Sequence, residues 1–397
     1  MKILFVCHRL PFPPKRGGKI RPFNIIRHMT NNGHEVTVAS LARSADEARD
    51  GAGLQDHCHE VLVETVSSGP AWGRMIARLA TTGPSSMGYF YSRRLARRID
   101  RLLDETSFDL IFVHCSSVAQ YVAHVQGTPK ILDFGDMDSQ KWLAYSSFKP
   151  FPLSLGYWLE GRKMERAERA LAAQFDLCTA TTKAELATLQ QMCPAEKTGW
   201  FPNGVDREYF CPDATVYDSN AICFVGRMDY YPNQQAMFDF CARVWPQIRE
   251  RRAQTTLTIV GAEPSSAVRA LAKMDGVSVT GSVPDVRPYL RASALTVAPL
   301  AIARGTQNKI LESLALGVPV VCSPTAAGGV DVEPGEELLV ADEPGRWVET
   351  ICAVLDDRER RAQLSEAGRQ RVATHHDWPT SMKRVDRLLE RAQGMTR

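Results

Sequence analysis

Short apolar runs alternate along the chain with segments in which apolar residues recur every three or four positions. The first run, residues 2–7, reads KILFVC, and runs such as EVTVAS and DLIFVHC follow it. Apolar runs of this length are typical of strands in a parallel sheet covered on both faces, and the three-to-four spacing indicates helices. The alternation predicts an α/β protein built from Rossmann-like, doubly wound parallel sheets.

The pattern breaks once, between Thr198 and Pro212. The segment GWFPNGVDREYFCP is rich in proline, glycine and aromatic residues and has no helical period. A second series of strands and helices follows, so we expect two domains, at residues 1–202 and 203–375, and a helix at 376–397 that returns to the first domain. Two such domains make the cleft between them the default binding site.

The twenty residues 303–322, ARGTQNKILESLALGVPVVC, carry the densest candidate chemistry. An apolar run ends at Gly305, a helix with one buried face follows, and Gly317 and Pro319 end that helix. Its N-terminus would lie beyond the carboxyl end of a strand, where backbone amides and the helix dipole favour an anion. A ligand with both phosphates and hydroxyls would suit the backbone at Gly305 and the polar side chains there, which are Arg304, Asn308, Lys309 and Glu312.

A pair of glycines, Gly17 and Gly18, precedes the first predicted helix. Adjacent glycines let backbone amides approach a phosphate closely. The segment matches neither GxGxxG nor GxxxxGK[ST], so a plain tight turn explains it equally well.

Composition excludes some classes of protein. No run of about 18 uncharged apolar residues is present, and the N-terminal apolar run before His8 and Arg9 is too short for a signal peptide. The ten cysteines are scattered singly. We therefore expect a cytoplasmic protein with reduced cysteines in its core.

The formal net charge of +3 is unevenly distributed. Residues 1–202 hold 25 Lys/Arg against 20 Asp/Glu, a net of +5, and the remainder holds 23 against 25, a net of −2. A helix predicted over residues 89–104 contributes to this excess through five arginines off its apolar stripe. They favour contact with an anionic membrane surface, although a solvated face partly paired with Asp100, Asp104 and Glu105 explains them nearly as well. The arginines are Arg93, Arg94, Arg97, Arg98 and Arg101.

An ordered set of motifs extends over nearly the whole chain. It comprises GG near the N-terminus, FPNGVD, FVGRMDYYPN, IVGAEP, VTGSVPDVRPYL, GTQNKILESLALGVPVV and a late HHDW. The set resembles the GT-B nucleotide-sugar glycosyltransferases of family 4, and most of all the branch associated with bacterial exopolysaccharide assembly. The resemblance implies a retaining transferase whose C-terminal domain binds the donor and whose N-terminal domain binds the acceptor.

The same resemblance implies the ligands. The donor would be a nucleoside diphosphate sugar and the acceptor a glycan or a lipid-linked glycan, with no required metal or other cofactor. We expect no nucleic-acid partner. If the basic helix does meet a membrane, the protein would act at its inner face. The alternatives are an isomerase of the same fold, such as a nucleotide-sugar 2-epimerase, and a non-catalytic protein that binds sugar nucleotides.

Three motif positions carry over directly. Arg227 matches the family's arginine that grips the donor pyrophosphate, a role suited to a bidentate guanidinium. Glu312 matches the glutamate that binds the ribose hydroxyls, and the Gly17–Gly18 pair matches the loop that faces the donor phosphate. The plain alternatives are a surface arginine after a strand and a solvated glutamate on a helix.

Other positions depart from the family pattern. Arg304 stands where the family usually has its first glutamate, which puts the identity of the sugar in doubt and indicates either an acidic sugar or a different binding register. The lysine common after the phosphate-binding arginine is missing from MDYYPNQQ, and we expect Lys309 to replace it. Asp136 stands where many members have a histidine, and His114 follows the neighbouring strand. We therefore expect Arg227, Lys309, Asp136 and His114 to be the catalytic groups.

Asp136 and Asp138 also form a DxD sequence, which in other sugar transferases holds Mg²⁺ or Mn²⁺. The sequence lies in the half expected to bind the acceptor, and Asp138 with Ser139 suits the N-cap of a helix that begins at residue 140. We therefore expect no metal there.

Overall fold

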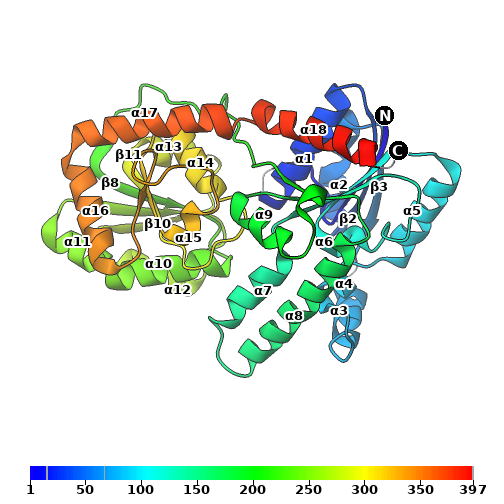
Figure 1. The fold of residues 1–397 in the computed structure, drawn as a ribbon. Helices are drawn as coiled ribbons and strands as arrows, with labels where there is room; N and C mark the ends of the chain where they lie inside the picture. The colour runs from blue at the N-terminus through cyan, green and yellow to red at the C-terminus, as the bar shows by residue number, and fades with distance from the viewer. Residues whose placement is uncertain (15–16, 67, 396–397) are drawn as a thin grey trace. The chain divides into compact units, whose positions relative to one another are not determined.

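The computed structural model describes residues 1–14, 17–66 and 68–395 of the chain. These residues form two compact units, which Figure 1 colours along the chain. Unit 1 comprises Met1–Phe201 and Met382–Arg397, and unit 2 comprises Pro202–Ser381. The divisions fall after residues 201 and 381, whereas the sequence pattern places them after 202 and 375.

Unit 1 is built around a seven-stranded sheet in the order β3-β2-β1-β4-β5-β6-β7, with all neighbouring strands parallel. The central strands are apolar and almost wholly buried, and Phe5 and Phe112 stack between them with ring centroids 5.1 Å apart. The strands are β1 (Lys2–Cys7), β2 (Glu35–Ala42), β3 (Glu60–Thr65), β4 (Leu110–His114), β5 (Lys130–Gly135), β6 (Leu177–Ala180) and β7 (Thr198–Trp200).

Helices follow the strands of unit 1 in alternation, which confirms the predicted α/β class. In Figure 1 the antiparallel pair α7 and α8 extends away from the sheet, and α3 extends in the same direction. The helices are α1 (Gly17–Asn31), α2 (Ala45–Asp50), α3 (Ser68–Ala77), α4 (Ser85–Tyr89), α5 (Arg93–Glu105), α6 (Ser116–Ala119), α7 (Asp138–Ser146), α8 (Leu153–Ala172) and α9 (Lys183–Gln190), with α18 (Trp378–Met395) entering from unit 2.

Three local predictions for unit 1 are wrong in their boundaries. The helix predicted from residue 89 begins at Arg93, because the Ser92 hydroxyl caps it by accepting the Leu95 N–H at 3.4 Å. Residues 198–200, which the sequence assigns to the linker, form β7 and pair with β6. The α7 helix begins at Asp138 itself, with Met137 rather than Asp138 in the cap position.

Unit 2 is built around a six-stranded parallel sheet in the order β10-β9-β8-β11-β12-β13. The first strand of this unit, β8, lies in the middle of the sheet. The next two, β9 and β10, lie on one side of it, and β11, β12 and β13 lie on the other. The strands are β8 (Asp218–Val225), β9 (Thr256–Val260), β10 (Val277–Gly281), β11 (Ser293–Ala298), β12 (Val320–Cys322) and β13 (Leu339–Val340).

The helices of unit 2 enclose a large apolar core, and a second, smaller apolar cluster includes Val225, Val260 and Leu290. The helix α14 fits the sequence prediction closely, since the predicted apolar positions Ile310, Leu311 and Leu314 are all buried. The helices are α10 (Tyr231–Arg243), α11 (Trp245–Arg251), α12 (Ser266–Ala270), α13 (Arg287–Arg291), α14 (Asn308–Ala315), α15 (Pro324–Ala327), α16 (Pro344–Asp356) and α17 (Arg358–His375).

The late HHDW motif lies where α17 ends and α18 begins. The Asp331 N–H donates to His376 Nε2 at 3.0 Å, so Nδ1 carries the ring proton and donates to the Asn203 carbonyl at 3.1 Å. Burial lowers the pKa of His376 to about 4, which keeps the ring neutral. A neutral histidine thus connects the end of α17 to Asn203 in the linker segment and to Asp331. The adjacent α18 continues into unit 1, where Arg391 Nη1 donates to the Thr198 carbonyl at 2.9 Å.

All ten cysteines are free thiols, and seven of them are buried, as expected for reduced core residues. Cys211 is exposed instead. Within the described residues, no helix is both long and apolar enough to cross a bilayer.

Candidate functional site

The donor-site candidates of unit 2 gather at one edge of its sheet. Arg227 lies two residues beyond β8, and the loop of residues 299–307 leads from β11 into α14. β8 and β11 are neighbours, and the order of the strands reverses between them. The carboxyl ends of two such strands form the position where open α/β sheets bind ligands.

Arg227 is held by two carboxylates. Its Nε and Nη2 donate to Asp229 Oδ1 and Oδ2 at 3.0 and 2.7 Å, and Nη2 also donates to Glu263 Oε2 at 2.7 Å. These bonds raise the pKa of Arg227 and lower that of Asp229. The guanidinium is partly exposed, so it already binds a bidentate anion at a place that solvent can reach.

Asn233 links Arg227 to Lys309. Its Nδ2 donates to the Arg227 carbonyl at 2.8 Å, and its Oδ1 accepts from Lys309 Nζ at 2.6 Å. The ammonium lies 4.5 Å from the ring centroid of Phe224, at the end of β8. The structure therefore brings the two predicted cations together through Asn233, a residue that the sequence analysis did not select.

Lys309 and Glu312 lie one turn apart on α14, and both are partly buried. Burial lowers the pKa of Lys309 to about 7 and raises the pKa of Glu312 to about 7, and the charge of each opposes the shift of the other. An arriving phosphate would favour the charged form of Lys309, because an anion at short range stabilises an ammonium.

The first residues of this loop and helix hold unsatisfied polar atoms. Thr306 Oγ1 and Asn308 Oδ1 are buried and find no hydrogen-bond partner within the described chain. Such atoms are rare in folded proteins and indicate a missing partner. Gly305 has a φ of +62°, which glycine adopts without strain. The neighbouring Arg304 side chain is exposed.

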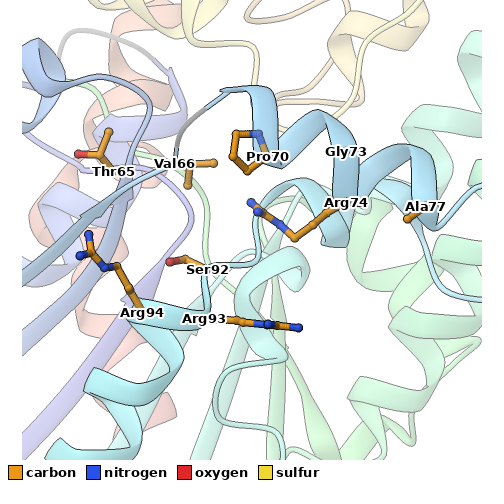
Figure 2. A pocket seen from close by; sticks show the side chains of 9 residues that line it. All are labelled: Thr65, Val66, Pro70, Gly73, Arg74, Ala77, Ser92, Arg93 and Arg94. Atoms are coloured by element: carbon orange, nitrogen blue, oxygen red, sulfur yellow. The ribbon is translucent and has the colours of Figure 1, made fainter.

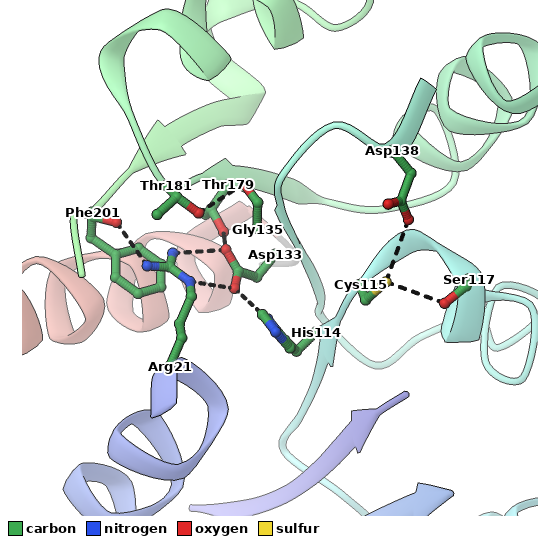
Figure 3. A network of polar contacts seen from close by, with 10 residues as sticks. All are labelled: Arg21, His114, Cys115, Ser117, Asp133, Gly135, Asp138, Thr179, Thr181 and Phe201. Atoms are coloured by element: carbon green, nitrogen blue, oxygen red, sulfur yellow. Dashed lines mark hydrogen bonds and ion pairs between the residues drawn. The ribbon is translucent and has the colours of Figure 1, made fainter. Parts of the chain in front are cut away.

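Unit 1 brings His114 into a buried polar network, drawn in Figure 3. His114 Nδ1 lies 2.7 Å from Asp133 Oδ2, and Arg21 donates to both oxygens of Asp133, each at 2.9 Å. Arg21 also donates to the Phe201 carbonyl, and Thr179 donates to Asp133 Oδ1, both at 2.9 Å. Sequence reasoning missed Asp133 and Arg21, although an aspartate inside the apolar run KILDF was a signal.

This network sets the chemistry of His114. Arg21 holds the pKa of Asp133 well below its usual range against the effect of burial, so Asp133 is a carboxylate that only accepts hydrogen bonds. His114 Nδ1 therefore carries a proton, and in the neutral ring Nε2 is an acceptor. His8 lies beside it, with ring centroids 6.0 Å apart, and burial lowers the pKa of His8.

The remaining candidates of unit 1 are Asp136 and Asp138, which follow β5, and Gly17 and Gly18, which are on the same helix as Arg21. Asp136 follows β5, and burial raises the pKa of its carboxyl. Asp138 Oδ2 contacts Cys115 Sγ at 3.7 Å. Gly17 and Gly18 begin α1 and are exposed, and the same helix carries Arg21. In the described parts of the chain, no three His, Cys, Asp or Glu residues are grouped to hold a metal ion.

Backbone strain marks both sites. Among the described non-glycine residues, only Cys115 and Glu263 have positive φ, at +85° and +55°. Cys115 follows His114, and Glu263 holds Arg227. Strained residues of this kind concentrate at functional sites.

Unit 1 also contains a cavity of about 560 Å³ between α3, the end of β3 and the start of α5. Figure 2 shows Arg74 reaching from α3 toward this space, while Arg93 and Arg94 leave the first turn of α5 in different directions. The five predicted arginines of α5 are all exposed, and Arg98 pairs with Glu64 at 2.8 Å. None of the predicted catalytic residues lines this cavity.

Named relatives share parts of the sequence. A D-inositol 3-phosphate glycosyltransferase of Thermobispora bispora is 25% identical over 59% of this chain, and the match spans 61% of that relative. A GDP-mannose-dependent alpha-(1-6)-phosphatidylinositol monomannoside mannosyltransferase of Mycobacterium tuberculosis is 27% identical over 47% of this chain and 54% of its own length. These curated relatives are thus matched over less than two thirds of their length.

Solved structures share the fold over almost the whole chain. Anabaena Alr3699/HepE in complex with UDP has a TM-score of 0.69 at 17% identity, covering 98% of this chain and 100% of that one. The sucrose-phosphate synthase of Thermosynechococcus elongatus has a TM-score of 0.73 at 15% identity, with 98% of both chains covered. These likenesses confirm the predicted GT-B arrangement of two Rossmann-like domains.

Two family descriptions match consecutive parts of the chain. "Glycosyltransferase Family 4" matches residues 16–209, and "Glycosyl transferases group 1" matches residues 219–357. The first corresponds to unit 1 and the second to the sheet of unit 2, which holds Arg227, Lys309 and Glu312. The two matches together extend over most of the chain, and it resembles the family 4 glycosyltransferases in both units.

Proposed function

We propose that the protein transfers a sugar, with retention of anomeric configuration, from a nucleoside diphosphate sugar to a hydroxyl of a glycan or lipid-linked acceptor. The observation that carries this proposal is the linked set Arg227, Asn233 and Lys309 at the carboxyl ends of β8 and β11. Two cations and a helix N-terminus suit a diphosphate, and Glu312 suits a ribose.

In this reaction the diphosphate displaces the carboxylates of Asp229 and Glu263 from Arg227. Phosphate oxygens reproduce the bidentate pattern that Asp229 now supplies. As the bond to the sugar breaks, negative charge grows on the leaving diphosphate, and Arg227 and Lys309 stabilise it in the transition state. The leaving phosphate takes the proton of the acceptor hydroxyl, so this step needs no separate base.

The loop before α14 would hold the rest of the donor. Thr306 Oγ1 and Asn308 Oδ1 gain the hydrogen-bond partners that they lack when phosphate or hydroxyl groups occupy the site. Arg304 stands where the family's first glutamate usually contacts the sugar. An exposed cation at that place favours a sugar that carries a carboxylate.

In unit 1, His114 would orient a substrate hydroxyl. Asp133 fixes the ring so that Nε2 accepts a hydrogen bond, and Arg21 keeps Asp133 charged. Asp136 follows β5, the strand paired with the one that ends at His114, and burial raises the pKa of its carboxyl. The donor phosphate would also meet the amides at Gly17 and Gly18.

The names of similar proteins support the ligand classes. Anabaena Alr3699/HepE is solved with UDP-glucose, and the named relatives act on an inositol phosphate or a phosphatidylinositol mannoside. A teichuronic acid glycosyltransferase of Bacillus subtilis is 35% identical over 27% of this chain. We therefore place the protein in bacterial polysaccharide or glycolipid assembly, at the cytoplasmic face of the membrane.

The first experiment is a thermal-shift screen of UDP, GDP, ADP and dTDP sugars. Donor at about a hundred times its dissociation constant adds about 2.7 kcal/mol of apparent stability. Release of the nucleoside diphosphate is then measured with and without a lipid-phosphate acceptor. Transfer predicts acceptor-dependent release, an epimerase would convert the donor without acceptor, and a binding protein would release none. If no nucleotide sugar shifts the melting temperature, the proposal is wrong.

A further inference from the structure

Exposed apolar side chains concentrate on one part of unit 1. Of the fourteen large apolar side chains exposed in the described chain, nine lie within residues 72–79, which are the second half of α3 and the two residues after it, and 148–159 of the α7–α8 hairpin. They include Phe151, which is 80% exposed, Leu79 at 63% and Trp158 at 47%. We call these two segments the apolar tip. Single exposed apolar residues are ordinary, but a cluster of this size marks a contact surface.

The two segments are held together. Lys163 Nζ on α8 donates to the carbonyls of Arg78 and Leu79 at the end of α3, at 3.1 and 2.9 Å. Glu160 is buried and accepts from the Ser85 and Ser86 N–H groups at 3.1 and 2.9 Å. Figure 1 shows α3 and the α7–α8 hairpin ending on the same side of unit 1. The apolar tip is therefore one built surface.

The apolar tip itself carries only positive charge. Its segments 72–79 and 148–159 contain Arg74, Arg78 and Lys149 and no Asp or Glu. Of the nearby acids on α8, Glu160 is buried and Glu165 pairs with Arg162. Arg74 and Arg78 donate to the carbonyls of Gly88 and Pro84, at 3.1 and 3.4 Å, so uncharged groups satisfy them. Positive charge beside exposed Trp, Phe and Leu is the pattern of a protein surface that lies in the interface of an anionic bilayer.

We propose that the apolar tip inserts into the surface of a bilayer that contains anionic phospholipids. The exposed rings and leucines enter the boundary between headgroups and acyl chains, while Arg74, Arg78, Lys149 and Lys163 stay at the level of the lipid phosphates. A second copy of the chain fits this surface less well, because a symmetric contact would bring the same positive charges face to face.

This proposal deepens the proposed function by naming the surface through which the enzyme reaches a lipid-linked acceptor. It assigns the main membrane contact to the apolar tip, whereas the sequence pattern assigns it to the arginines of α5. It can fail independently of the transfer reaction, because vesicle binding and donor binding are separate measurements and the apolar tip contains none of the proposed donor-binding residues.

The test is flotation of the full chain with phosphatidylcholine vesicles, with and without phosphatidylglycerol. The variant carries Phe151→Gln, Leu155→Gln and Trp158→Gln, and the matched control is Val216→Gln, an apolar residue of unit 2 that is 92% exposed. We expect wild type and control to float with the anionic vesicles, and the triple variant to bind them about tenfold or more weakly. Donor-induced thermal shift should stay at the wild-type value in both variants.

A second measurement reports insertion directly. Lipids brominated on the acyl chain should quench tryptophan fluorescence of the wild type, and Trp158→Phe should lose part of that quenching while still floating. Equal vesicle binding by wild type and triple variant would overturn the proposal, as would no wild-type binding to either vesicle. A wild-type dimer that the triple variant converts to a monomer would assign the tip to a second copy instead. Vesicle binding without any donor binding would leave this proposal standing and remove the proposed function.

Discussion

At the scale of single residues, the proposed transfer depends on the cations that the strand ends bring together. Arg227, just beyond β8, and Lys309, in the first turn of α14, are about eighty residues apart in sequence, and Asn233 connects them by hydrogen bonds of 2.8 and 2.6 Å. Their present partners are an amide and two carboxylates, all polar groups that a diphosphate can replace.

We predict that Lys309→Ala and Arg227→Ala each lower kcat by about a hundredfold or more, because each removes a charge aimed at the leaving diphosphate. The measurement is turnover at saturating donor. Lys273→Ala, an exposed lysine in the same unit, serves as the control and should retain wild-type turnover. Undiminished turnover in Lys309→Ala would remove Lys309 from the mechanism.

The pKa of Glu312 makes stability depend on pH. Burial raises this pKa from 4.5 to about 7, so over that interval the folded protein binds more protons than the unfolded chain. Stability from the protonated group is present in full below about pH 4.5 and is lost as the pH rises through 7. Glu312→Gln stays neutral at all pH values and lacks this loss.

We therefore predict that wild type loses about 1 to 3 kcal/mol of unfolding free energy relative to Glu312→Gln as the pH rises from about 4.5 to about 7. The measurement is urea unfolding of both proteins across that range. Lys309, whose pKa is lowered to about 7, acts in the opposite sense only above that pH. A stability difference independent of pH would contradict the buried environment of Glu312.

The buried pair of Arg21 and Asp133 predicts a large loss of stability on substitution. Asp133→Asn leaves the Arg21 guanidinium buried without a counter-charge, which costs about 3–5 kcal/mol. The control is Asp46→Asn, whose partner Arg49 is exposed, and that change should cost less than about 1 kcal/mol. Urea unfolding measures both, and equal costs would show that the Asp133 network does not stabilise unit 1.

At the scale of elements, the strands and helices follow from the sequence pattern more closely than the sites do. Apolar runs such as KILFVC and VPVVC specify buried parallel strands, because both faces of each strand must be covered. The boundaries that differ are set by side-chain caps and by pairing with distant strands, as at Ser92 and Thr198. Such contacts depend on the fold and leave little trace in local spacing.

The candidate sites were predictable where a charged residue follows a strand. Arg227, Lys309 and His114 stand at strand ends or at the helix start beyond one, and the topology brings them to the sheet edges. Asn233 and Arg21 could not be found this way, because each lies within an amphipathic helix and gains its role from partners far away in sequence. The roles themselves stay predictions.

We also predict that the arginines of α5 contribute to membrane contact. Replacing Arg93, Arg94, Arg97 and Arg98 with Gln should weaken binding to anionic vesicles at low salt by about tenfold or more, because each cation near the lipid adds about 1 kcal/mol. The difference from wild type should shrink at physiological salt as screening increases. Flotation at both salt concentrations measures it.

The matched control for α5 removes four exposed arginines of unit 2, by Arg251→Gln, Arg269→Gln, Arg346→Gln and Arg358→Gln. It loses the same charge from another unit and should float like the wild type. If both variants weaken binding equally, only the net charge matters. If neither does, α5 has no part in membrane contact and its arginines are a solvated helix face.

At the scale of the whole molecule, each unit has its own core and its own polar site at the carboxyl ends of its strands. Unit 2 supplies cations and unsatisfied acceptors suited to a donor, and unit 1 supplies an oriented histidine and the apolar tip. Transfer of a sugar from one site to an acceptor at the other would use both units.

Because the cations already present suit the diphosphate, we predict that turnover survives excess EDTA. A loss of turnover that only Mg²⁺ or Mn²⁺ restores would contradict this prediction.

Retaining transfer is tested by the anomeric form of the first sugar released from an α-linked donor. The full chain is incubated with UDP-glucose, or with the nucleotide sugar of largest thermal shift, and water serves as the acceptor. Proton NMR records the released sugar before mutarotation. A retaining transferase predicts the α-anomer together with an equal amount of nucleoside diphosphate, and both should fall about a hundredfold in Lys309→Ala. Release of the β-anomer, or an equal rate in Lys309→Ala, would contradict the account.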